Sequence, residues 1–328
     1  MDQDRRRVLQ SLLIGTAGLA VGRTMGAPPP RAGKPSGGSV VARAKRSGMA
    51  DDKGAIDFAK QREAAGAAIA KAVGEKGPVE AFRRLYKPQD VVGIKINTLG
   101  GKGISPEPAF VYGLAAWLQE AGVPARNIVV FDLREPHLLK VGYAPGSSEG
   151  GVRCVAIKED FEKTPREWGP GASCFARILA EEITALLSVA VLKDHGLSGV
   201  SIALKQWYGV IHNPNKYHDD GCQPYIAHLA AFPLVRDKLR LTVVDAAVAQ
   251  CHGGPGRAPR WAWPYAGFLA STDPVAVDAV ARDVLEARRK EVGLPPLAAE
   301  GREPRYIAGA ARLGLGVADP QRIEKVEV

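Results

Sequence analysis

The sequence predicts an α/β protein with a mainly parallel sheet flanked by helices. Apolar runs of strand length recur along the chain, helix-forming segments separate them, and polar residues follow several of the runs. Continuous apolar runs are typical of parallel strands that are buried on both faces, and their alternation with helices indicates βαβ units. The 328 residues leave room for one large domain or for two lobes with a cleft at the strand ends.

The predicted domain spans residues 55–328, and its first half contains a βαβ unit. Helices are expected over 55–73, 79–86 and 105–122, and strands over 90–97 and 127–132. The helical segments are rich in strong helix formers, and both strands are apolar runs. Ser105 is the expected N-cap of the third helix, with a proline in its first turn.

The second half continues the alternation of strands and helices. Strands are expected over 152–158, 188–194, 239–249, 266–271 and 322–328, and helices over 175–187 and 272–290. The last helix has the clearest start, because a Thr-Asp cap precedes Pro274 in its first turn. Asp273 and Asp278 are therefore expected to cap this helix and to pack it.

The N-terminus has the pattern of an export signal. Consecutive arginines precede an apolar stretch that ends near Gly22 and is short for a bilayer span, so residues 1–27 resemble a twin-arginine signal peptide. The resemblance implies a partner in the twin-arginine export machinery, a periplasmic or exported location, and membrane contact only through an uncleaved signal. Residues 28–54 are rich in Pro, Gly and Ser, so we expect a flexible linker there.

The net charge of +9 does not indicate nucleic-acid binding. Residues 1–50 contain nine Lys or Arg and two Asp, which leaves a charge of only +2 for residues 51–328. A nucleic-acid-binding domain needs a basic face. We therefore exclude DNA and RNA as partners of the predicted domain.

The apolar runs of four predicted strands end in polar residues, and a glycine-rich loop follows the first of them. These residues are Asn97, Asp132, Asp194 with His195, and Asp245. Ligands of open parallel sheets bind beyond the carboxyl ends of the strands, so we expect a cleft there for an unidentified small-molecule substrate. Asn97 with Gly100 and Gly101 could meet an anionic group of a cofactor, although a tight turn without a ligand fits the same residues. Asp194 and Asp245 would orient histidines around the cofactor.

The cysteines Cys154, Cys174, Cys222 and Cys251 form no C-x-x-C motif. Buried, inert thiols are expected at Cys154 and Cys174. The other two cysteines have histidine neighbours, which makes them candidate ligands of a transition metal such as nickel, iron, zinc or copper. The full candidate set is His212, His218, Cys222, Cys251 and His252. Two unrelated loops without a metal remain the alternative.

His195 and Lys205 are the candidate catalytic residues. His195 follows a predicted strand, and Lys205 lies in an apolar stretch, 198–211, that reads as a helix. An apolar setting lowers the pKa of a lysine and favours covalent or electrostatic catalysis. A lysine whose ammonium group extends to the surface is the alternative.

Several of these segments together resemble a bacterial and archaeal family known as domain of unknown function 362. The resemblance rests on "VVGIKIN", "SPEPAFVYGLAAWLQEAG", "NIVVFD", "LKDHGLSGVSIALKQWYGVI" and "AGFLASTDPVAVDAVARDVL" and runs from about Val91 to the C-terminus. It implies an iron–sulfur or redox role, but the ferredoxin-like cysteine motif of some members is absent from this chain.

The stretch from His195 to Lys205 is also similar to nickel-pincer lactate racemase. This similarity implies that His195 transfers protons and that Lys205 carries a covalently attached nickel cofactor. The Gly-Gly that precedes the lysine in that family is replaced by Ile202-Ala203. His212 and His218 are the candidates for its downstream nickel-binding histidine.

These observations predict an exported protein that binds a metal or metal cofactor and serves a redox or metal-assisted reaction. A non-catalytic periplasmic protein that binds a metal or another ligand is the alternative from a different functional class. A third alternative is an exported structural partner without a ligand. The substrate, the metal and the oligomeric state are not determined by the sequence.

Overall fold

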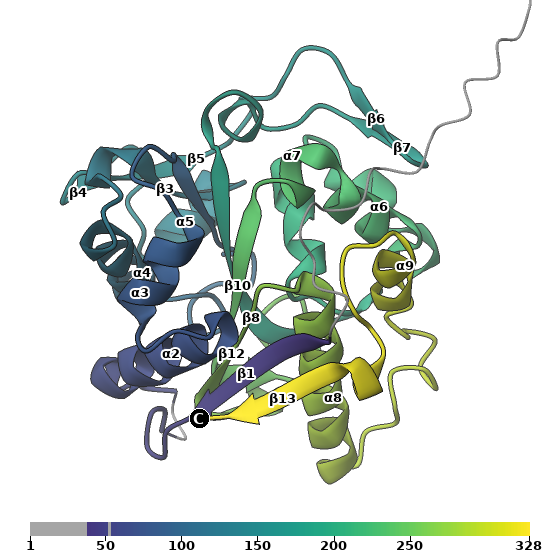
Figure 1. The fold of residues 1–328 in the computed structure, drawn as a ribbon. Helices are drawn as coiled ribbons and strands as arrows, with labels where there is room; N and C mark the ends of the chain where they lie inside the picture. The colour runs from purple at the N-terminus through teal and green to yellow at the C-terminus, as the bar shows by residue number, and fades with distance from the viewer. Residues whose placement is uncertain (1–37, 52–53) are drawn as a thin grey trace, which may run out of the picture.

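A large sheet organises the molecule. The computed structural model describes residues 38–51 and 54–328, and within them the strand order is β13-β1-β12-β10-β8-β2-β3-β5-β4, with β11 paired to β10 and β9 to β8. The strand bounds are β1 Ser39–Lys45, β2 Val92–Lys95, β3 Ile128–Asp132, β4 Ser148–Glu149, β5 Val152–Ala156, β8 Ala185–His195, β9 Gly199–Val200, β10 Leu239–Gln250, β11 Ala262–Trp263, β12 Gly267–Ser271 and β13 Ile323–Glu327. A separate hairpin, β6 Arg166–Trp168 and β7 Gly171–Ser173, projects beyond the sheet (Figure 1).

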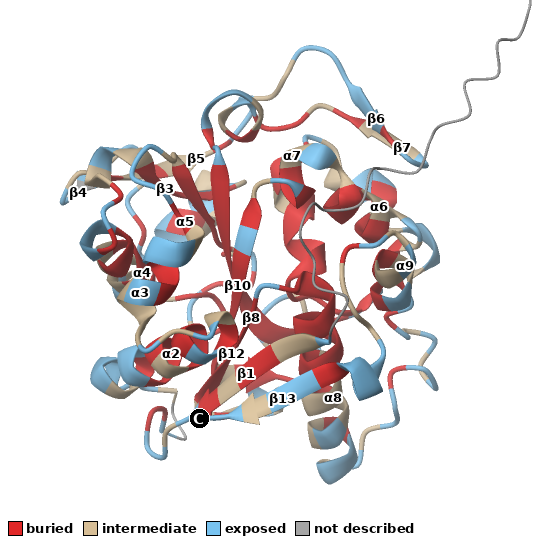
Figure 2. Ribbon diagram, in the orientation of Figure 1, coloured by how far each residue is buried: buried red, intermediate tan, exposed pale blue. Residues whose placement is uncertain are grey.

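The central strands β10, β8, β2, β3 and β5 pair in parallel, which confirms the predicted α/β class. Antiparallel pairs lie toward the two edges, at β12 with β10 and at β4 with β5. All eleven residues of β8 are buried, as expected for a strand covered on both faces. Figure 2 shows this burial along the central strands and on the inner sides of the helices.

Helices cover both faces of the sheet. The helices are α2 Phe58–Val73, α3 Pro78–Leu85, α4 Pro108–Glu120, α5 Glu135–Val141, α6 Tyr225–Ala231, α7 Pro233–Arg236, α8 Pro274–Glu291 and α9 Tyr306–Arg312. One apolar core joins α2, α3 and α4 to the sheet, and a second joins α6, α8 and α9 to it (Figure 1). None of the helices in the described residues is long and apolar enough to cross a membrane.

The prediction of a flexible linker over residues 28–54 is wrong for the middle of that segment. Residues Ser39–Lys45 form β1, which pairs in parallel with β13 and antiparallel with β12. The partner β13 lies at the other end of the chain, so the local Gly- and Ser-rich composition does not reveal the pairing. The predicted signal peptide, residues 1–27, lies outside the described residues.

Three other local predictions need correction. Helix α4 begins at Pro108 with Glu107 as its N-cap, and Ser105 lies before it. The expected helix over 175–187 is reduced to one π-helical turn, Ile178–Glu182, because the central strand β8 already begins at Ala185. The expected helix over 198–211 is a 3₁₀ helix at Leu204–Val210, preceded by β9.

Candidate functional site

A pocket of about 450 Å³ lies at the carboxyl ends of the parallel strands. The last residues of β2, β3 and β8, namely Lys95, Asp132 and His195, all line it. The segment after β8 covers these ends and contributes Lys205, Tyr208, His212 and His218 to the lining. The predicted cleft at the strand ends is therefore present.

Two buried polar side chains hold the lysine-bearing segment against the sheet. Asp278 of α8 accepts hydrogen bonds from the backbone N–H groups of Ala203 and Leu204, at 2.7 and 3.1 Å. Gln206 donates to the carbonyl oxygens of Lys95 and Val189, both at 2.9 Å. Asp278 was expected to pack its own helix, but it caps the first turn of the neighbouring 3₁₀ helix instead.

Lys205 is buried, with 6% of its surface exposed, and it still lines the pocket. Its Nζ lies 3.2 Å from Nε2 of His218, 3.5 Å from Sγ of Cys222 and 4.0 Å from the ring centroid of Tyr208. Within the described residues, no carboxylate forms an ion pair with it. Burial lowers the pKa of Lys205 to about 8, although the Cys222 thiol opposes the shift.

His218 presents a nitrogen lone pair to this lysine. Its Nδ1 lies 3.0 Å from the carbonyl oxygen of Pro214, which can only accept, so Nδ1 carries the ring proton. Burial and the Lys205 charge lower the pKa of His218, which keeps the ring neutral. Nε2 of His218 therefore accepts a hydrogen bond from Nζ of Lys205.

His195 has the opposite tautomer. Its Nδ1 accepts hydrogen bonds from the backbone N–H groups of Leu197 and Ser198, at 3.1 and 3.2 Å. Burial and the surrounding positive charges, first that of Lys205, lower the pKa of His195 to about 2. The ring is therefore neutral with its proton on Nε2, and it can donate a hydrogen bond into the pocket but cannot accept a proton there.

A buried ion pair closes the other side of the pocket. Nζ of Lys95 lies 2.7 Å from Oδ1 of Asp132, whose Oδ2 accepts from the backbone N–H and the hydroxyl of Thr98. Burial alone would raise the pKa of Asp132, but the Lys95 charge and these hydrogen bonds hold it below its usual value. Gly209 leaves the space for this pair, since an added Cβ would lie 2.8 Å from Nζ of Lys95.

Only some residues of the expected anion loop and of the expected metal site line the pocket. Asn97 and His212 line the pocket, and Nδ1 of His212 lies 3.2 Å from the hydroxyl of Ser173. An added Cβ on Gly100 would lie 2.9 Å from Nζ of the buried Lys193, and Gly101 has φ of +78°. Close packing and a left-handed turn therefore account for both glycines.

Asp194 and Asp245 do not orient histidines, contrary to expectation. Asp194 accepts from the backbone N–H of Gly254 and from Arg302, which also donates to the backbone oxygen of His195. Asp245 is not a strand-end residue, since β10 continues to Gln250, and its carboxylate accepts from the backbone N–H of Ala247. The backbone of residues 197 and 198 orients His195 instead.

Cys251 and His252 are not among the residues that line this pocket. Nδ1 of His252 lies 3.4 Å from Arg289 and 3.4 Å from Arg302, and the Cys251 thiol lies 3.6 Å from the carbonyl oxygen of Trp261. The backbone oxygen of Cys251 also accepts from Arg289, so both residues adjoin an arginine network in which Arg302 binds the backbone oxygen of His195. In the part of the chain that the structure describes, no three His, Cys, Asp or Glu side chains form a group suited to a metal ion.

The pocket has an excess of positive charge. Its lining contains three cationic side chains, Lys95, Arg134 and Lys205, and one carboxylate, Asp132. Lys193 adds a buried amine nearby, and burial lowers its pKa to about 8. Lys95, Arg134 and Lys193 were not among the predicted site residues, although the strand-end position of Lys95 and the Lys-Asp-His triplet at the end of β8 are visible in the sequence.

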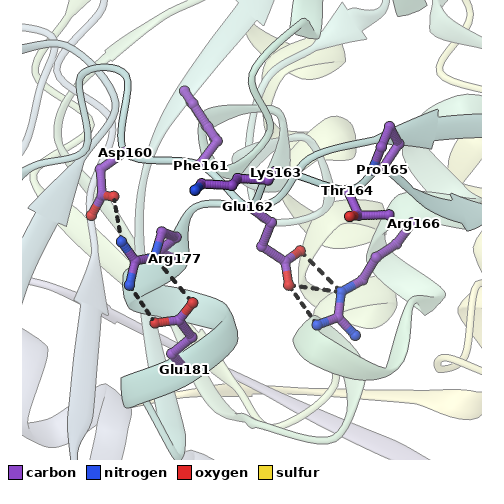
Figure 3. Close-up of a pocket in the computed structure, with 9 residues that line it drawn as sticks. All are labelled: Asp160, Phe161, Glu162, Lys163, Thr164, Pro165, Arg166, Arg177 and Glu181. Carbon is purple, nitrogen blue, oxygen red and sulfur yellow. Dashed lines mark hydrogen bonds and ion pairs between the residues drawn. The ribbon is translucent and has the colours of Figure 1, made fainter.

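A second hollow, of about 750 Å³, lies beside the projecting hairpin (Figure 3). Six charged side chains line it, three of each sign, and five of them form ion pairs: Arg166 with Glu162, and Arg177 with Glu181 and with Asp160. These pairs are exposed, so they bind each other weakly and present little net charge to a ligand. The pocket at the strand ends is the better candidate site.

Comparison with known proteins gives a family and little else. A family described as "Domain of unknown function (DUF362)" matches residues 92–283. No curated protein matches the chain. A crystal structure of a protein from Thermotoga maritima is similar at 13% identity with a TM-score of 0.36, over 51% of this chain and 49% of that chain.

Proposed function

The chain belongs to the DUF362 family, and from its pocket we propose that it is an enzyme that acts on a small anionic molecule through the amine of Lys205. The observation that carries the proposal is the setting of Lys205. A buried amine that lines a pocket, lacks a carboxylate partner among the described residues and contacts a neutral histidine is typical of a reactive lysine.

The charge of the pocket supports an anionic substrate. Lys95 and Arg134 exceed the single carboxylate of Asp132, which is already bound to Lys95 and Thr98. Two of the three protons on Nζ of Lys205 point to His218 and Cys222, which leaves one for a ligand. A carboxylate or phosphate oxygen on the substrate would complete this arrangement.

The two histidines support different roles. Neutral His218 can take a proton from Nζ of Lys205 and so release the free amine that attacks a carbonyl carbon. His195 presents Nε2–H, which can stabilise negative charge on a substrate oxygen. Attack by the amine on an aldehyde or ketone gives a carbinolamine, and loss of water from it gives an imine.

Trapping of such an imine tests the proposal. Glyoxylate, a small aldehyde with a carboxylate, is added with borohydride, and the labelled lysines are found by peptide mass spectrometry. We expect Lys205 to be carboxymethylated ahead of the other lysines, and Lys193→Arg protein to be labelled like wild type at Lys205. Equal labelling of many lysines with Lys205 unmodified would exclude the proposed role.

A metal site is the second candidate, supported by the lone pair on Nε2 of His218. Nε2, the Lys205 amine and the Cys222 thiol are close enough to act as ligands of nickel, iron, zinc or copper, once Lys205 loses a proton. A bound metal would supply Lewis-acid or redox chemistry. Metal analysis of exported protein tests this: one metal per chain should be lost in His218→Gln and retained in His252→Gln protein.

Export and catalysis need separate tests. We propose that residues 1–27 direct export by the twin-arginine route, so Arg6→Lys with Arg7→Lys should leave the protein in the cytoplasm. The rival to an enzyme is a periplasmic binding protein. A Lys205→Met protein that retains its role in the cell would support that rival, because binding alone does not need the reactive amine.

A further inference from the structure

Cys222 lies behind Lys205 in an unusual backbone conformation. Three successive residues, Asp220, Gly221 and Cys222, have positive φ values of 45°, 63° and 68°. A left-handed conformation is unfavourable at the two non-glycine positions, so the surrounding contacts must hold it. The result is a fully buried thiol whose Sγ lies 3.5 Å from Nζ of Lys205.

The sulfur lies directly against an amine. Nζ of Lys205 donates a hydrogen bond to Sγ of Cys222, whereas the Tyr208 hydroxyl donates its proton to the carbonyl oxygen of Tyr217. A sulfenic acid formed at this sulfur would therefore have a nucleophilic nitrogen beside it. Cys222 is fully buried and is not among the residues that line the pocket, so peroxide must pass Lys205, which does line it, to reach the sulfur.

We propose that hydrogen peroxide converts the Cys222–Lys205 pair into a covalent sulfur–nitrogen cross-link. In the first step the thiol attacks peroxide, which gives a sulfenic acid and one water; sulfur loses two electrons and the peroxide oxygen gains them. In the second step the amine of Lys205 attacks this sulfur, the S–O bond breaks, and the oxygen leaves as a second water. The product is a sulfenamide, Cys–S–NH–Lys.

The geometry selects this product over the usual ones. A disulfide needs a second thiol next to the sulfur, whereas the group that lies at hydrogen-bonding distance from Sγ of Cys222 is the amine of Lys205. Nε2 of His218 can accept the proton that the amine must lose. A thiol reductant would cleave the S–N bond and restore both side chains.

The consequence for activity rests on the proposed function of Lys205. A lysine joined to sulfur cannot form an imine, so oxidation would switch the enzyme off and reduction would restore it. The cross-link itself does not depend on that function. Labelling of reduced protein with glyoxylate tests the function, whereas peptide analysis of oxidised protein tests the cross-link.

The experiment treats full-length protein with hydrogen peroxide and analyses its peptides without reduction. We expect a peptide pair joined through Cys222 and Lys205, lighter by two hydrogens than the separate peptides, which disappears on treatment with dithiothreitol. Cys154→Ser is the matched control, because it removes another buried thiol, one that forms hydrogen bonds with Tyr112 and Ala144. This protein should give the same cross-link as wild type.

Lys205→Arg protein provides the second arm, since it retains the charge but lacks a primary amine. Its Cys222 sulfenic acid should persist and be trapped by dimedone, whereas wild-type protein should give little of this adduct. Oxidation of wild-type Cys222 to sulfinic acid with Lys205 still free would overturn the proposal. So would equal dimedone labelling of the wild-type and Lys205→Arg proteins.

Discussion

Nε2 of His218 lies 3.2 Å from Nζ of Lys205, and the bond from Nδ1 of His218 to Pro214 fixes which of the two nitrogens donates. The histidine can therefore receive a proton from the lysine without first losing one of its own. The same contact links the proposed imine chemistry, the candidate metal site and the proposed cross-link. Unfolding experiments, NMR spectroscopy and chemical labelling can test this description of the site.

Replacement of Lys205 by Met should stabilise the protein while removing the reactive group. With a folded pKa of about 8 against an ordinary value of 10.5, the unfolded chain binds the proton more tightly, so the buried ammonium is destabilising below pH 8. The free energy of unfolding of Lys205→Met should exceed that of wild type by about 1–3 kcal/mol at pH 7. The difference should shrink as the pH rises from 8 to 10.5, as urea titrations can show.

Asp245→Asn should show the opposite pH dependence. Burial raises the pKa of Asp245 to about 7 from 3.8, so the folded protein retains a proton that the unfolded chain has lost between these values. The contribution of Asp245 to the free energy of unfolding of the wild-type protein therefore falls as the pH rises from about 4 to 7. The free energy of unfolding of Asp245→Asn should exceed that of wild type by about 1–3 kcal/mol at pH 8 and should equal it near pH 4. Asp57→Asn, at an exposed helix cap, is the control; a matching pH-dependent gain there would contradict the burial argument.

Gly209→Ala should damage the pocket. The new Cβ would lie 2.8 Å from Nζ and 3.1 Å from Cε of Lys95, so the buried pair with Asp132 must shift. We expect a loss of about 1–3 kcal/mol in thermal or urea unfolding and weaker glyoxylate labelling of Lys205. Gly113→Ala in α4 meets nothing within 4 Å and should stabilise the helix by about 0.5–1 kcal/mol. Equal effects of the two substitutions would show that Lys95 is not constrained as described.

The tautomer of His195 can be observed directly. Because Nδ1 accepts two backbone hydrogen bonds and the pKa lies near 2, the ring should remain neutral with Nε2–H from pH 5 to 8. Nitrogen-15 NMR of labelled protein should show an unprotonated Nδ1 and a protonated Nε2, with no titration in this range. A titration near the ordinary value of 6.5 would contradict the assignment.

The sequence revealed the class of the fold and the edge of the sheet at which the site lies. Apolar runs identified the central strands, and the residues after them, such as Asn97 and His195, line the pocket as expected. Strand β1 was missed because its partners come from the other end of the chain. Local composition cannot report such pairing.

The sequence predicted several of the residues that line the site, but not the contacts that they make. Lys205, His195 and His218 were selected from sequence and share one pocket. Cys251 and His252 were grouped with them only because cysteine and histidine are common metal ligands, and their contacts are with Trp261 and two arginines. The tautomers of His195 and His218 depend on backbone groups, which no side-chain pattern reveals.

The pH dependence of amine labelling at Lys205 tests the central claim most directly. Trace labelling with an amine-reactive reagent, read by peptide mass spectrometry, gives the ionisation midpoint of each lysine in the intact protein. A reactive Lys205 should titrate near pH 8, well below the ordinary lysine value of 10.5, and the surface lysines serve as internal controls. A midpoint for Lys205 at or above that of the surface lysines would contradict the account.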